Sequence, residues 1–160
     1  MKADFMIPFV EATSSICEEI SGKSVSRGEL SVQKDLVTTV PINIVCGISG
    51  EIEGIALLGL SKETAMKIAS LMIGSDLRVF DNAVSAVLVE LGNRIVEAST
   101  DALSQMGFQF RLTPSVLVRG MSISISTNDT PALIVPLNFA NIGTVEVKLS
   151  VRLNKTVEAA

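Results

Sequence analysis

The segment from Asn82 to Met106 constrains the fold of this chain most strongly, because it is long, free of proline and amphipathic throughout. Its apolar residues recur at intervals of three and four, which is typical of a helix with one face on a core. The predicted buried stripe contains Val84, Val87, Leu88, Leu91, Ile95, Ala98, Ala102 and Met106. The opposite, polar face contains Ala86, Glu90, Asn93, Glu97 and Asp101. We therefore expect a long helix, with Asp81 as its N-cap, that presents a rigid polar face outward.

Two further helices and a series of strands are predicted around this segment. The helices span 4–20 and about 62–73, the second capped by Ser61. Alternating or β-branched runs predict strands at 26–33, 36–49, 52–60, 109–118, 121–127, 132–139 and 144–153. This order indicates an α+β (mixed α/β) fold with three helices and a largely antiparallel sheet. We expect one domain over residues 1–160, with 154–160 as a frayed tail. Each half has a helix followed by strands, so an internal duplication stays open.

The composition excludes several classes of partner. Thirteen basic and seventeen acidic residues leave a net charge of −4, and there is no Trp or Tyr for base stacking, so nucleic acid is not an expected partner. The longest uncharged stretches, 36–50 and 130–145, have 15 and 16 residues and contain Pro and Gly. Both are shorter than the ~20 apolar residues of a spanning helix. The apolar run at 5–10 is too short for a signal peptide. We expect no membrane partner and a cytoplasmic location.

The absence of histidine limits the chemistry that the chain can perform. No His-based triad or general base is available, and a zinc site built on Cys17 and Cys46 would lack two ligands. Both cysteines stand at apolar positions, so we expect two reduced, buried thiols without a structural disulfide. Any catalysis must use carboxylates, amides, hydroxyls or groups that a partner supplies.

Glu90 and Asn93 are the candidate site residues. They stand three residues apart, close to one helical turn, so a carboxylate and a carboxamide share one side of the helix. The alternative is a merely solvated helix face, since Glu97 and Asp101 continue the polar row. Gly92 between them costs about 1 kcal/mol relative to Ala in a helix, so it needs a reason. It either lets a partner's backbone approach or accommodates a neighbouring element of the same chain.

The chain resembles the CheX branch of the CheC/CheX/FliY chemotaxis phosphatases over nearly its whole length. The resemblance rests on Glu90-Leu91-Gly92-Asn93, the opening Phe9-Val10-Glu11-Ala12-Thr13-Ser14 and the later Leu133-Ile134-Val135-Pro136-Leu137. A proline follows the family's Glu-x-x-Asn pair after a fixed interval, and Pro114 is the candidate here, at a slightly shorter interval. Ala86 departs from the family's Ser or Asp at that position. Ser14 replaces the amide of a second motif in the first helix, which resembles the one-site CheX pattern.

The resemblance implies a CheC-like fold and hydrolysis of the aspartyl phosphate on a CheY-type response regulator. Asn93 would insert and orient the attacking water, because a carboxamide both donates and accepts hydrogen bonds and carries no charge. Glu90 would pair with the regulator's active-site Lys and need not act as a base. The regulator would supply Mg²⁺, so the chain would need no cofactor of its own.

The resemblance also implies a homodimer whose sheets join, with a site on each outer helix face. An uncovered long strand such as 144–153 would make an adhesive edge for such a contact. The alternative function is a non-catalytic interaction module of the chemotaxis or flagellar system. A small-molecule sensor has no Gly-rich loop or ligand motif to support it.

Overall fold

One antiparallel sheet organises the fold in a computed structural model that describes residues 2–127 and 129–154. Its strands, within that part of the chain, are β1 Val25–Arg27, β2 Ser31–Gln33, β4 Ile42–Gly50, β5 Ile52–Leu60, β6 Phe110–Leu112, β7 Val116–Arg119, β9 Ala132–Phe139 and β10 Gly143–Leu153. Their order across the sheet is β1-β9-β10-β5-β4-β6. Strand β2 continues the outer edge along β9, and β7 continues the opposite edge along β4. The short strands therefore form the two edges, and the long ones form the centre.

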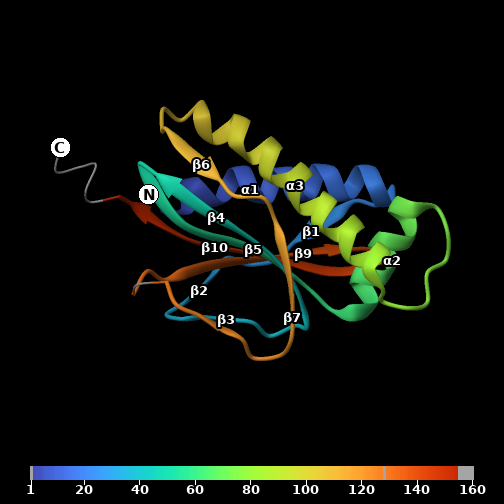
Figure 1. Cartoon of the computed structure of the whole chain (residues 1–160). Coiled ribbons are helices and arrows are strands. Elements are labelled where there is room, and N and C mark those ends of the chain that lie inside the picture. The colour runs from blue at the N-terminus through green and yellow to red at the C-terminus, as the bar shows by residue number, and fades with distance from the viewer. Residues whose placement is uncertain (1, 128, 155–160) are drawn as a thin grey trace.

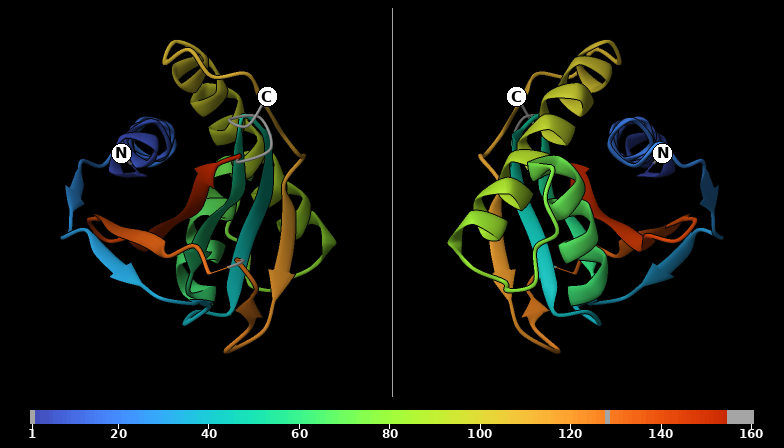
Figure 2. Two further views of the ribbon diagram at one scale, coloured as in Figure 1. Left: turned by 90° about the vertical axis from the view of Figure 1, so that its left-hand side faces the viewer. Right: turned by 90° about the vertical axis from the view of Figure 1, so that its right-hand side faces the viewer.

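Three helices cover one face of this sheet: α1 Lys2–Ser21, α2 Lys62–Ile73 and α3 Asn82–Ser104. Figure 2 shows the sheet as a curved layer with the helices gathered on one side of it. Ser61 and Asp81 cap α2 and α3 as predicted, because their side chains accept from the backbone N–H groups of Thr64 and Val84, each at 3.1 Å. The core lies between the helices and the alternate side chains of β4, β5, β9 and β10.

The small sheet β3 (Leu36–Val37) and β8 (Ser124–Ile125) covers part of the other face. Leu36 is fully buried there. Beneath it Lys148 of β10 is also buried, and its Nζ donates to the carbonyl oxygen of Val37 at 3.3 Å. The chain thus closes over both faces of its central strands. The predicted α+β class, with three helices and a largely antiparallel sheet, is confirmed.

Three of the predicted strands are each divided in two in the structure. Pro41 separates β3 from β4 within 36–49, and Pro114 separates β6 from β7 within 109–118. A proline cannot donate to a strand ladder, which explains both breaks. The strand predicted at 26–33 is interrupted at Gly28, where a Cβ would lie 2.5 Å from Pro136 Cγ. Of the strand predicted at 121–127, only β8 is formed.

The buried stripe of α3 differs from the prediction after Ile95. Ala98 and Met106 are exposed, whereas Ser99 and Leu103 are buried. The inward face therefore continues in steps of four residues over the last part of the helix, at Ile95, Ser99 and Leu103. Ser99 tolerates burial because its hydroxyl donates to the carbonyl oxygen of Ile95 at 2.7 Å.

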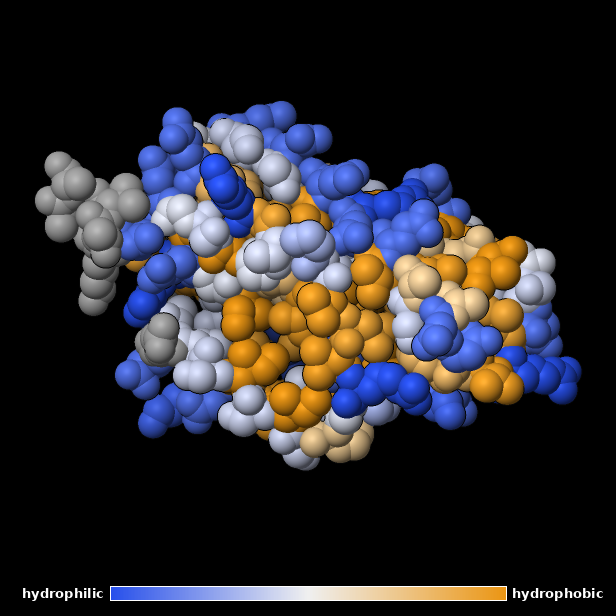
Figure 3. Space-filling view, viewed as in Figure 1, coloured by the Kyte–Doolittle hydropathy of each residue, from blue (hydrophilic) through white to orange (hydrophobic). Residues whose placement is uncertain are grey.

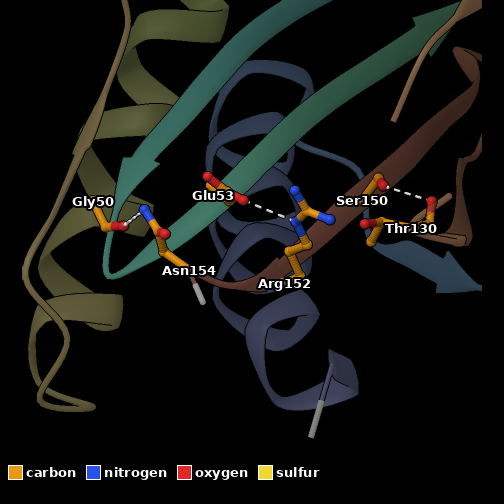
Figure 4. Close-up of polar contacts among 6 residues, drawn as sticks. All are labelled: Gly50, Glu53, Thr130, Ser150, Arg152 and Asn154. Carbon is orange, nitrogen blue, oxygen red and sulfur yellow. Dashed lines mark hydrogen bonds and ion pairs between the residues drawn. The ribbon is translucent and has the colours of Figure 1, made fainter. Parts of the chain in front are cut away.

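Strand β10 is not an edge strand, so residues 144–153 do not form the adhesive edge that we expected. It pairs with β5 along one side and with β9 along the other. Its end is also tied down: Asn154, the first residue of the expected frayed tail, donates through Nδ2 to the carbonyl oxygen of Gly50 at 2.9 Å. Figure 4 shows this contact beside the Arg152–Glu53 ion pair, whose Nε and Oε1 are 2.8 Å apart. Residues 155–160 of that tail lie outside the described residues.

Candidate functional site

Glu90 stands exposed on α3 with no ion-pair partner among residues 2–127 and 129–154. Arg94 lies four residues further on the same helix, at the usual spacing for a helical ion pair. The structure instead pairs Arg94 Nη2 with Glu19 Oε2 of α1, at 3.4 Å. The carboxylate of Glu90 therefore remains available to a cation from outside the chain.

Asn93 lies one turn after Glu90, at the margin between the polar and buried faces of α3, and is half-buried. Its Oδ1 accepts a hydrogen bond from the main-chain N–H of Ser115 at 2.8 Å. Its Nδ2 has no partner within the described part of the chain. The amide thus has one end fixed to the protein and one end open.

Gly92 serves packing within the chain. It is buried, and a Cβ at this position would lie 2.5 Å from Ile44 Cγ2 and 2.7 Å from Ser115 Oγ. Contacts that short cannot be accommodated without displacement, so the missing side chain lets α3 approach β4 and the start of β7. Of the two sequence interpretations, the one that invokes a neighbouring element is correct. The interpretation that leaves Gly92 open to a partner is wrong, because the residue is covered.

Pro114 reaches the site despite its shorter interval from Asn93. It lies in the corner between β6 and β7, directly before the residue whose N–H binds Asn93. Thr113 anchors the other side of this corner: its N–H donates to the carbonyl oxygen of Gly47 at 2.9 Å, and its Oγ1 accepts from the N–H of Gly47 at 2.7 Å. Sequence reasoning missed Ser115, although its position after Pro114 was the available signal.

Neither of the other two departures from the family pattern, Ala86 and Ser14, adds an exposed polar group to this arrangement. Ala86 is exposed on α3, one turn before Glu90, and offers no polar group. Glu11 on α1 is exposed, but Ser14 is buried, and its Oγ has no partner in the described residues. Glu11 and Ser14 therefore do not repeat the outward-facing pair of α3.

The titratable and metal-binding groups of the described residues add no second candidate site. Burial raises the pKa of the Cys17 thiol to about 12, although Arg94 lowers it slightly. Burial also raises the pKa of the Cys46 thiol to about 11, while a hydrogen bond with the backbone of Ala56 acts in the opposite direction and lowers it. Both cysteines are free and buried, as predicted. Their raised pKa values keep both thiols protonated near neutral pH. No group of three or more acidic or cysteine residues is placed to hold a metal within 2–127 and 129–154.

The surface beside the site is apolar. Figure 3 shows an apolar area below α3, at the place where β7 lies in the same view in Figure 1. Val116, the first residue of β7, is 58% exposed. None of the described helices is both long and apolar enough to cross a membrane. The open amide and the free carboxylate therefore stand next to a surface suited to contact with a protein.

Comparison with known proteins identifies the class of this fold. The family model described as chemotaxis phosphatase CheX matches residues 42–138. The CheY-P phosphatase CheX of Thermotoga maritima is 29% identical over 111 residues, which cover 69% of this chain and 68% of that protein. A CheC-like superfamily protein from Shewanella has the same fold, with a TM-score of 0.83, 21% identity and coverage of 95% of this chain and 99% of that one.

A further solved structure includes a partner. It is the CheX-CheY-BeF3-Mg complex from Borrelia burgdorferi, with a TM-score of 0.78, 27% identity and coverage of 92% of this chain and 97% of that chain. The fold is thus that of the CheC-like proteins. The matched segment contains Glu90, Asn93 and Pro114 and spans more than half of the sequence. The chain belongs to the CheX chemotaxis phosphatase family.

Proposed function

We propose that this chain accelerates hydrolysis of the aspartyl phosphate on a CheY-type response regulator. The names of the Thermotoga relative and of the Borrelia complex support this substrate class. The observation that carries the proposal is the pairing of a half-open, fixed carboxamide at Asn93 with an unpaired carboxylate at Glu90. Both groups lie on one side of a rigid helix, one turn apart.

Asn93 orients the attacking water in this proposal. An acyl phosphate is already reactive, so the missing contribution is a water held in line with the bond to phosphorus. An uncharged amide suits this task because it does not repel the phosphoryl oxygens. Its Oδ1 has a second lone pair beyond the one used by Ser115, and neither donor of its Nδ2 is used by another of the described residues. Positioning of this kind supplies on the order of 10²–10³ in rate.

Glu90 fixes the docking register by pairing with the regulator's active-site Lys. A carboxylate next to a phosphoryl group is unfavourable unless a cation lies between them, and that Lys is such a cation. Glu90 has no ion-pair partner in the described part of the chain, which supports this role. In this scheme the Mg²⁺ also comes with the regulator and neutralises the phosphoryl oxygens, so the chain supplies no metal ligand.

We also propose a cytoplasmic homodimer joined at the β1/β2 edge of the sheet. The β6/β7 edge adjoins Asn93, so a dimer contact there would cover the site. The β1/β2 edge lies at the far end of the sheet and exposes Leu30 and Val32, at 49% and 63%. An apolar strand edge of this kind favours pairing with a second copy. Light scattering should show a dimer that Val32→Lys weakens, and a monomer at all concentrations would contradict the proposal.

The second candidate is a non-catalytic module that binds the regulator without turnover. The exposed Ala86, in place of a polar group one turn before Glu90, favours it. The test is loss of phosphate from an excess of phosphorylated regulator with Mg²⁺ and a small amount of this chain. Many turnovers per chain establish the phosphatase. Binding without acceleration establishes the module.

A further inference from the structure

The half-buried amide of Asn93 is held by a contact from a distant part of the chain. The donor is the main-chain N–H of Ser115, 22 residues along the sequence and 2.8 Å from Oδ1. Ser115 is itself buried. The direction of this bond fixes the amide: turning it over would place the NH₂ group against another N–H donor, which cannot accept a hydrogen bond.

Two features of the chain bring this N–H to the helix. At Gly92 a Cβ would also lie 2.9 Å from Ser115 Cβ, so any side chain there would push the corner away. Pro114 ends the β6 ladder with a residue that has no N–H, and Thr113 fastens the corner to Gly47 of β4 through two hydrogen bonds. The N–H of Ser115 is therefore held from both sides, by the helix and by the sheet.

We propose that the main-chain N–H of Ser115 is a positioning group that fixes the rotamer of Asn93 before a partner arrives. Gly92 makes the close approach possible. The amide then presents Nδ2 and the second lone pair of Oδ1 outward in one orientation. This inference rests on the proposed phosphatase function and explains how a single surface amide is held with the geometry that in-line attack requires. Ser115 does not touch the reacting atoms in this scheme.

The first test removes the N–H without changing the docking surface. Ser115→Pro lacks the donor, whereas Ser115→Ala keeps it and removes only the hydroxyl. We expect Ser115→Pro to lower kcat on the order of tenfold with KM for the phosphorylated regulator within about twofold, and Ser115→Ala to retain most of kcat. In an Asn93→Ala background, Ser115→Pro should lower kcat no further, because it acts through that amide. Equal effects of the two substitutions, or an additional loss in that background, overturn the proposal.

The second test needs no substitution at Ser115 and no activity. Amide hydrogen exchange at Ser115 should be slower in the original chain than in Asn93→Ala, while amides of β5 exchange at the same rate in both. Equal exchange rates at Ser115 in the original chain and in Asn93→Ala would overturn the inference, even if Ser115→Pro does not fold. The failure of the proposed function looks different, because the unsubstituted chain would then show no turnover although Ser115 is protected.

Discussion

Arg94 on α3 pairs with Glu19 on α1, at 3.4 Å between Nη2 and Oε2, and not with Glu90 on its own helix. The packing of α1 against α3 brings Glu19 to Arg94, although Glu90 stands at helical ion-pair spacing from the same arginine. Exposed pairs of this kind contribute little stability, typically about 0.2–1 kcal/mol. The Arg94–Glu19 pair therefore contributes little to the stability of the fold. Its main effect is that it keeps Arg94 away from the carboxylate of Glu90, which stays available to a partner.

Glu19→Gln should weaken docking of the regulator. Without its partner, Arg94 is free to pair with Glu90 at i, i+4 and to mask the carboxylate. Because such helical pairs are worth roughly 0.3–0.5 kcal/mol, KM should rise about twofold with kcat unchanged. Steady-state phosphate release measures both. Adding Arg94→Ala should restore KM, and a double variant no better than Glu19→Gln would contradict this account.

Asn93→Ala should remove the rate enhancement and spare binding. The loss in kcat is expected on the order of 10²–10³, with Kd for a beryllium-fluoride form of the regulator within about threefold. Glu97→Ala is the matched control, since Glu97 is an exposed residue one turn further along the same face. Wild-type turnover by Asn93→Ala would show that the assigned role is wrong.

Glu90→Ala should impair docking as well as turnover. Loss of an exposed ion-pair partner for the regulator's Lys should raise Kd about three- to tenfold, because interface pairs at the rim are worth roughly a kcal/mol. The effect should shrink as salt concentration rises, since screening already weakens the pair. Titration by fluorescence or calorimetry at low and high salt measures it. A salt-independent loss would indicate a packing role for Glu90.

Gly92→Ala should destabilise the chain although alanine is the better helix former. The Cβ would meet Ile44 and Ser115 at 2.5 and 2.7 Å. Overpacking typically costs about 1–3 kcal/mol, and the helix gain offsets about 1 kcal/mol of it. Urea unfolding should therefore give a net loss of up to about 2 kcal/mol. Adding Ser115→Gly should relieve part of the loss, because it removes the Oγ and Cβ that the new methyl group meets.

Stability should fall on the alkaline side of pH 9. The unfolded thiols ionise near their ordinary pKa of 9.0, whereas burial raises the pKa values of Cys17 and Cys46 to about 12 and about 11. Between these limits the folded chain holds more protons than the unfolded chain, so the free energy of unfolding decreases as pH rises. Thermal unfolding from pH 8 to 10.5 checks the direction. Cys17→Ala should flatten the decline, and an unchanged slope would show that other groups cause it.

The sequence predicted those features of the fold that are determined by residues close together along the chain. The length of α3, its Asp81 cap and the exposure of Glu90 all follow from a single helical period and a capping residue. Pro41 and Pro114 also stand in the sequence, inside the strands that we predicted at 36–49 and 109–118. A strand that is interrupted by proline is better interpreted as two short strands.

The contact that holds Asn93 could not be read from local patterns. It joins a helix to a corner that comes after an intervening turn and strand, and only the packing at Gly92 brings the two together. The same is true of Arg94, for which the sequence offered Glu90 and the fold selected Glu19. Periodicity placed the candidate residues on a face, but tertiary packing determined which of their polar groups remain open.

The corner between β6 and β7 ties the amide to the outermost strands on one side of the sheet. A ligand or antibody fragment that binds those strands would therefore act on the amide that we propose orients the attacking water, without covering it. An inhibitor of this protein would therefore not need to imitate a phosphorylated carboxylate. A ligand that displaces the β6/β7 edge would also move the N–H of Ser115 away from Asn93.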